Sequence, residues 1–212
     1  MTEITVFTTI DDYVAFLSRF PIMAGEAFCL GYVPSCFFPK DSVLRFFTRH
    51  ERACNPLVVA DSLWEYGRHQ ISHLTQRRAR MCMELRPIRR LCSAGQVHDA
   101  TPEFEVGFAE RTYVLRKIKA LLQRGSLFIF DQPVPFTFRL HPPDGVLLDV
   151  TKNIAEQKIQ GVYLRDHKTF ESFTSEFNRL IALAGPQESK NPIRSTIDDA
   201  IAALSAGERY DW

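Results

Sequence analysis

Apolar residues recur along this chain with two periods, one typical of strands and one typical of helices. Short runs rich in β-branched and aromatic residues predict strands at 4–9 and 27–33. Similar runs in the second half predict a meander of further strands, at 126–131, 133–141, 146–150 and 161–166. The turn-forming stretch His-Pro-Pro-Asp-Gly, residues 141–145, separates the second strand of this meander from the third.

Helical spacing of apolar residues predicts the remaining elements, and the longest of them is a helix over 57–93. Thr9 and Asp12 are placed to cap the first helix, and Gly125 is placed to end the helix before the meander. The other predicted helices are 10–20, 43–51, 103–124, 167–184 and 193–207. This order predicts an α+β fold, in which a helical N-terminal and middle region packs on a small, mainly antiparallel sheet closed by C-terminal helices.

The clearest linker signal is a stretch of small, polar and turn-forming residues at 93–103. It divides the chain into a mainly helical region, 1–100, which contains the basic helix 57–93, and an α+β region, 101–212. One continuous domain is the alternative, because 212 residues can form a single core.

The formal net charge of +1 hides a segregation of charge along the chain. Residues 68–124 carry twelve Lys and Arg against five Asp and Glu, which gives a net charge of +7. The flanking segments 1–67 and 125–212 each carry a net charge of −3. A basic segment between acidic ones indicates an acidic binding partner or ion pairs within the protein.

The densest part of this segment is 77–90, with a single acid and six arginines: Arg77, Arg78, Arg80, Arg86, Arg89 and Arg90. At about 100° per residue these arginines do not share one face of a helix, and Pro87 interrupts the helix. Two interpretations follow. The arginines pair with acids of the flanking segments, or they contact an acidic partner, which is nucleic acid or protein.

A second candidate site follows the last predicted strand, where Arg165, Asp166 and His167 stand at the start of a helix. The end of a strand can carry a ligand or catalytic site, whereas Asp166 can also serve as a helix cap. His141 is expected on a solvent-exposed turn. The chain contains no glycine-rich phosphate loop and no Gly-x-Ser-x-Gly motif, and we expect no cofactor and no metal.

The five cysteines include no Cys-x-x-Cys pair and suggest neither a disulfide framework nor a zinc ribbon. The first residues, MTEITVFTTIDDY, carry acids early and do not resemble a signal peptide. No run of about eighteen apolar residues occurs, so we expect no membrane partner. These features predict a cytoplasmic protein with reduced thiols, of undetermined oligomeric state.

Residues 111–185 carry a helix, a glycine, strands separated by a turn, and a final helix, in an order that resembles a known family. The matching positions are Gly125, Pro135, Asp144, Phe177 and Ala184. This pattern resembles the C-terminal portion of degenerate phospholipase D-like modules, which are sensor or regulatory domains in some bacterial transcription regulators.

The resemblance implies a module without phosphodiesterase activity. The active phospholipase D motif is His-x-Lys followed by Asp, whereas His167 and Lys168 are adjacent in this chain. These regulators also carry an N-terminal winged helix, and residues 1–60 show no such pattern.

These observations favour a non-enzymatic regulatory or interaction protein whose basic segment contacts an acidic partner, nucleic acid or protein. Two alternatives stay open. One is a structural or assembly subunit that binds partner proteins through an apolar N-terminal surface. The other is an enzyme with a site near Arg165, Asp166 and His167.

Overall fold

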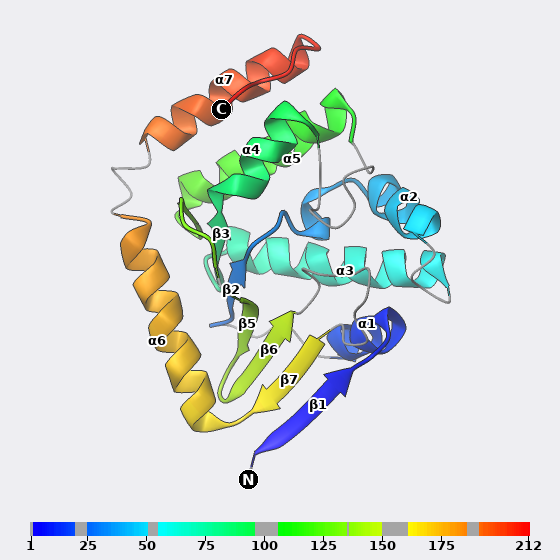
Figure 1. Cartoon of the computed structure of the whole chain (residues 1–212), viewed down its shortest axis with the longest axis vertical. Coiled ribbons are helices and arrows are strands. Elements are labelled where there is room, and N and C mark those ends of the chain that lie inside the picture. The colour runs from blue at the N-terminus through cyan, green and yellow to red at the C-terminus, as the bar shows by residue number, and fades with distance from the viewer. Residues whose placement is uncertain are drawn as a thin grey trace.

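The computed structural model describes residues 2–19, 25–50, 55–95, 106–134, 136–149, 161–185 and 191–212, apart from the side chains of 49, 50 and 191. Helices pack on both faces of one mixed β-sheet (Figure 1), so the predicted α+β class is confirmed. None of the described helices combines the length and the apolar character that a membrane crossing requires.

The sheet has the strand order β1-β7-β6-β5-β2-β3-β4. Its strands are β1 (Glu3–Phe7), β2 (Ala27–Leu30), β3 (Arg80–Glu84), β4 (Leu127–Phe130), β5 (Thr137–His141), β6 (Gly145–Asp149) and β7 (Gly161–Arg165). Strands β2, β3 and β4 are parallel, and the other neighbouring pairs are antiparallel. The sheet is larger than the predicted meander, because three strands from the first half of the chain join it.

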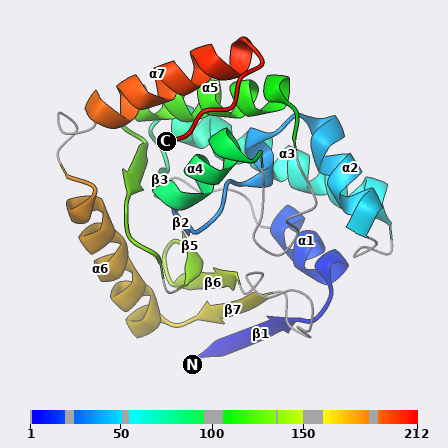
Figure 2. The same cartoon turned by 45° about the horizontal axis from the view of Figure 1, so that its top comes forward.

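The helices connect these strands and cover both faces of the sheet. They are α1 (Ile10–Arg19), the short 3-10 helix η1 (Ser35–Phe37), α2 (Lys40–His50), α3 (Pro56–Thr75), α4 (Leu85–Ser93), α5 (Phe108–Arg124), α6 (His167–Leu183) and α7 (Asn191–Ser205). Helix α7 lies along α5, and the last residues of the chain run back toward α4 (Figure 2). There Tyr210 and Trp212 pack against the larger of the protein's two hydrophobic cores.

Successive side chains of each strand point to opposite faces of the sheet, so the strands contribute to two hydrophobic cores, one on each face. On one face, Phe28 and Leu147 belong to the larger core, which α1, α3 and α5 cover. On the other face, Cys29 and Phe138 belong to a smaller core beneath Phe173 and other residues of α6. Both faces of the central strands are therefore shielded from water.

The predicted helix over 57–93 is wrong. The structure has α3 up to Thr75, then strand β3, and then α4 from Leu85. The reason is the Met81–Met83 stretch, whose side chains are fully buried between β2 and β4. A strand at the centre of a covered sheet is apolar on both faces, so its sequence carries no alternation that would distinguish it from a buried helix.

Several local predictions are confirmed. The amide of Asp12 donates to Oγ1 of Thr9 at 3.1 Å and caps α1. Gly125 follows α5 with φ of 75°, a left-handed conformation that favours glycine after a helix. The linker predicted at 93–103 lies largely outside the described residues.

Candidate functional site

The structure separates the six arginines of the predicted basic helix into two groups. Arg77 and Arg78 lie in the turn after α3, and Arg80 is the first residue of β3. The second group lies on α4, beyond the other end of β3, and comprises Arg86, Arg89 and Arg90. Because β3 has five residues with a rise of about 3.3 Å each, roughly 16 Å of strand lies between the groups.

Two arginines of the α4 group pair with acids of the fold itself. Arg86 Nη2 lies 3.4 Å from Oε2 of the buried Glu84. Arg89 makes hydrogen bonds of 3.0 and 3.3 Å with the two carboxylate oxygens of Asp131. Arg89 therefore fixes the segment that follows β4 against α4. This contact is the internal pairing with a flanking acidic segment that the sequence suggested as one interpretation.

The first group is joined by Arg124, which the sequence analysis did not single out. Nη1 of Arg124 lies 3.4 Å from the carbonyl oxygen of Thr75, at the end of α3. The amide of Met81 donates to the carbonyl of Ser126, so the start of β3 lies beside the end of α5. We call the surface formed by the first group and this residue the basic edge: Arg77, Arg78, Arg80 and Arg124.

All four side chains of the basic edge are exposed. Within the described part of the chain, none of them forms an ion pair with a carboxylate, in contrast to Arg68 and Arg179 on the helix surfaces. Arg80 instead lies over the ring of Phe177, with its guanidinium carbon 5.4 Å from the ring centroid. The basic edge is thus a group of cations that no acid among the described residues neutralises.

The residues of the second predicted site each engage a different local partner. Arg165 Nε lies 3.1 Å from Asp144 Oδ1. His167 Nε2 lies 3.3 Å from Glu171 Oε1, and its side chain is 73% exposed. Asp166 accepts a 2.9 Å hydrogen bond from the amide of Thr169 and caps α6. That hydrogen bond lowers the pKa of Asp166, as expected of a cap.

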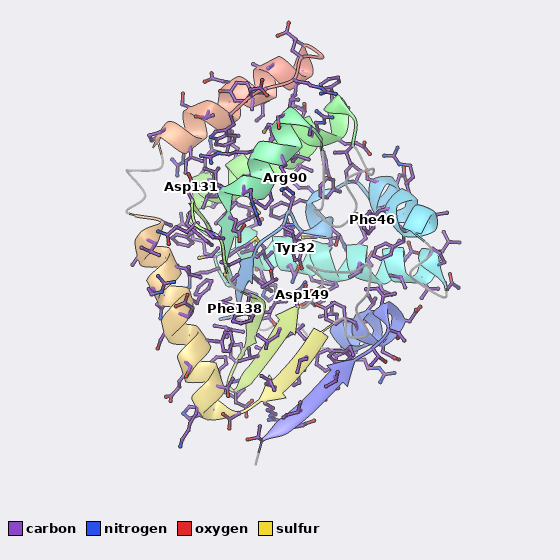
Figure 3. The ribbon with its side chains drawn as sticks, in the orientation of Figure 1. Tyr32, Phe46, Arg90, Asp131, Phe138 and Asp149 are labelled. Carbon is purple, nitrogen blue, oxygen red and sulfur yellow. The ribbon has the colours of Figure 1, made fainter. Side chains whose placement is uncertain are left out.

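A buried polar cluster that the sequence analysis did not predict lies under α1 and α3. We call it the Arg139 cluster, and its members are Tyr13, Tyr32, Tyr66, Arg139 and Asp149. Arg139 is only 7% exposed and Asp149 only 8%. In Figure 3, Tyr32 and Asp149 lie near the middle of the molecule.

The two charges of this cluster are held by hydrogen bonds and by an aromatic face. Tyr32 donates to Asp149 Oδ2 at 2.5 Å, and Tyr13 donates to the same oxygen at 3.4 Å. Arg139 Nη2 lies 3.9 Å from that oxygen, and the guanidinium lies over the ring of Tyr66. Burial and the charge of Asp149 raise the pKa of Tyr32 well above its usual value, so this phenol stays protonated and donates.

His141 is buried, so its predicted place on an exposed turn is wrong. It is the last residue of β5, is 5% exposed, and its Nδ1 lies 3.1 Å from Oε1 of Glu26. Glu26 is 1% exposed and lies just before β2, the neighbour of β5. This pair therefore extends the buried polar contacts of the Arg139 cluster along the same covered face.

The buried cysteines Cys36 and Cys92 have thiols whose pKa values are raised by burial. The pKa of each thiol is raised to about 12. Neither thiol therefore forms a nucleophilic thiolate near neutral pH. Among the residues that the structure describes, no group of three or more His, Cys, Asp or Glu side chains is arranged to hold a metal ion.

No protein family matches the chain, and no curated protein is significantly similar to it.

Proposed function

We propose that this chain is a non-enzymatic regulatory or interaction protein that contacts an acidic partner, nucleic acid or protein, through the basic edge. The observation that carries the proposal is four exposed arginines gathered at one end of the sheet without acids paired to them among the described residues. Clustered cations attract polyanions and steer their approach. Arg86 and Arg89 are left out of this contact because acids of the fold already hold them.

The backbone of Arg77 supports a role for its side chain outside folding. Its φ of 59° lies in the left-handed region. A residue with a Cβ is less stable there by about 1–2 kcal/mol, and glycine or asparagine is the usual occupant after a helix. The turn itself would be more stable with glycine or asparagine than with arginine. The exposed positive charge of Arg77 is instead suited to contact with an acidic partner.

Part of the basic edge also stabilises the helices that end there. The last carbonyls of a helix carry partial negative charge, and a nearby cation contributes about 0.3–1 kcal/mol. Arg124 approaches the carbonyl of Thr75 in this way. Stability and binding must therefore be measured separately when these arginines are replaced.

The proposal includes the resemblance to degenerate phospholipase D-like regulatory modules. Elements α5, β4, β5, β6, β7 and α6 follow in the order that the resemblance implies, and Asp144 lies in the turn between β5 and β6. In the N-terminal stretch, β1 and β2 are strands of the sheet and α1 lies between them in the chain. The proposal therefore assigns no winged helix to this part of the chain.

A matched pair of double variants tests the contact. Arg77→Gln/Arg78→Gln removes two charges from the basic edge. Arg68→Gln/Arg179→Gln removes two exposed arginines elsewhere, each paired with a glutamate three residues before it. Binding to labelled duplex DNA, single-stranded RNA and a polyglutamate peptide is measured by fluorescence anisotropy at low and moderate salt.

We expect one of the three probes to bind the wild type. The basic-edge variant should weaken that binding by about tenfold or more. If the probe is nucleic acid, the slope of the logarithm of the binding constant against the logarithm of the salt concentration should also become shallower, by about two, because two phosphate contacts are lost. The control variant should change binding by less than about twofold. Absence of binding to every probe at low salt, or equal losses in both variants, would contradict the proposal.

A further inference from the structure

The two ends of the sheet, β1 and β4, differ in how far they are covered. Three of the four residues of β4 are buried, whereas only Phe7 is buried among the five residues of β1. β1 pairs with β7 along its whole length, from Glu3 with Arg165 to Phe7 with Gly161. Among the described strands, none pairs with the other side of β1, so the backbone donors and acceptors there are not used by the sheet.

The side chains of β1 divide between the two faces of the sheet. Phe7 points toward α1, where its ring lies 5.7 Å from Tyr13 and 4.7 Å from Phe16, measured between centroids. Ile4 and Val6 point to the opposite face and are 62% and 49% exposed. Figure 1 shows β1 at the outer margin of the sheet, beyond β7.

This edge has few of the features that keep exposed strands from pairing, since its one charged side chain, Glu3, stands at the end of the strand. Its sequence, EITVF, contains no proline and no lysine, and its register with β7 is continuous, without a bulge. Proline, lysine and bulges are the common means by which proteins protect such an edge. β1 instead presents two exposed β-branched side chains beside an unused row of backbone groups.

We propose that β1 is a dimerisation strand that pairs antiparallel with β1 of a second copy of this chain, about a two-fold axis at Thr5. An axis perpendicular to the sheet keeps the α6 face of both copies on the same side. Ile4 and Val6 of one copy therefore meet only Ile4 and Val6 of the other. With the axis at Thr5, all five residues of the strand pair. Ile4 of each copy then lies opposite Val6 of the other copy, which gives two equivalent contacts.

The second copy is favoured over another occupant because the strand complements itself. Pairing about a two-fold axis buries both exposed aliphatic side chains of both copies at once, and the assembly closes at two subunits. Pairing of β1 with β4 of another copy would instead require the end of the sheet that is mostly buried. Because the strand is short, its interface is smaller than that of a permanent dimer, and the association is expected to be reversible.

Two double variants test this register. Ile4→Lys/Val6→Lys places lysine against lysine at both contacts across the axis. Ile4→Lys/Val6→Glu places lysine against glutamate at the same two contacts. Both variants replace only Ile4 and Val6, whose side chains are about half exposed or more, so both variants should fold. Circular dichroism and thermal unfolding verify this.

Sedimentation over a range of concentrations measures the association. The mass of the wild type should rise from 24.4 kDa toward twice that value. The lysine–lysine variant should stay at 24.4 kDa throughout, while the lysine–glutamate variant should dimerise like the wild type.

Three outcomes would overturn the inference. They are a wild type that stays monomeric at every concentration, a lysine–lysine variant that still dimerises, and equal loss of dimer in both variants. Growth beyond two subunits would overturn the two-fold arrangement. None of these results bears on the basic edge, which lies at another part of the sheet.

Discussion

Asp149 and Arg139 carry opposite charges into the core, and each depends on its neighbours to remain there. Asp149 accepts hydrogen bonds from Tyr13 and Tyr32. Arg139 Nη2 lies 3.9 Å from the same Asp149 oxygen, and its guanidinium lies over the ring of Tyr66. Buried charges are tolerated only where polar partners replace the lost water. The cluster therefore joins α1, α3 and the segment after β2 to strands β5 and β6.

Removal of one charge should be more damaging than removal of both. We expect Arg139→Met to lower the free energy of unfolding by about 3–5 kcal/mol, because it leaves the buried Asp149 without its counter-charge. Arg139→Met/Asp149→Asn should recover part of this loss. Urea unfolding of the wild type, the two single variants and the double variant measures the coupling. Strictly additive losses would show that the two charges do not interact.

Arg139 and His141 show why sequence reasoning missed this cluster. Both alternate with apolar residues in β5, and such alternation usually marks a strand with one face in water. Here helices cover both faces, so the polar residues are buried as well. Nothing in the local pattern reports the presence of α1 and α3 above this strand.

Among the elements, β3 was the least predictable. Its apolar stretch lies between two arginine-rich segments and matches a buried helix as well as a buried strand. The pairing with β2 and β4 decides between them, and both partners are distant in the sequence. The same pairing places the arginines before β3 and those after it at opposite ends of the strand.

Helix α3 lies so close to η1 that a methyl group has no room between them. A Cβ at Gly67 would lie 1.9 Å from Cβ of Cys36 and 2.9 Å from its Cα. We expect Gly67→Ala to lower the free energy of unfolding by about 1–3 kcal/mol, because overpacking outweighs the roughly 1 kcal/mol gain in helix propensity. Urea unfolding measures the change.

Gly107→Ala is the matched control for this prediction. The nearest atom to a Cβ at that position is Glu110 Oε2 at 3.6 Å, an ordinary contact. This variant should change the free energy of unfolding by less than about 1 kcal/mol. Equal stability of Gly67→Ala and the wild type would show that α3 can move away from η1 without loss.

On the scale of the whole molecule, strands from both halves of the chain alternate in one sheet. β2 and β3, from the first hundred residues, lie between β5 and β4 of the second half. At the other end, β1 pairs with β7. Each half therefore contains strands whose neighbours belong to the other half.

This interleaving predicts a single cooperative unfolding transition. Neither 1–100 nor 101–212 can complete its part of the sheet alone, so heating should produce one calorimetric peak whose enthalpy equals the van't Hoff value. Fragments that end at the predicted linker should not fold separately. Two resolved transitions, or a folded fragment 1–100, would instead support two independent domains.

The sequence by itself determined the α+β class, most helices and strands, and the local signals at their ends, such as Thr9, Asp166 and Gly125. These features depend on residues close together in the chain, through periodicity, capping and turn geometry. Only the tertiary structure decided that β3 is a strand, that Arg139 and His141 are buried, and that Arg124 joins Arg77, Arg78 and Arg80. Those outcomes depend on which distant segments cover or pair with each residue, and a local pattern of polar and apolar positions does not contain that information.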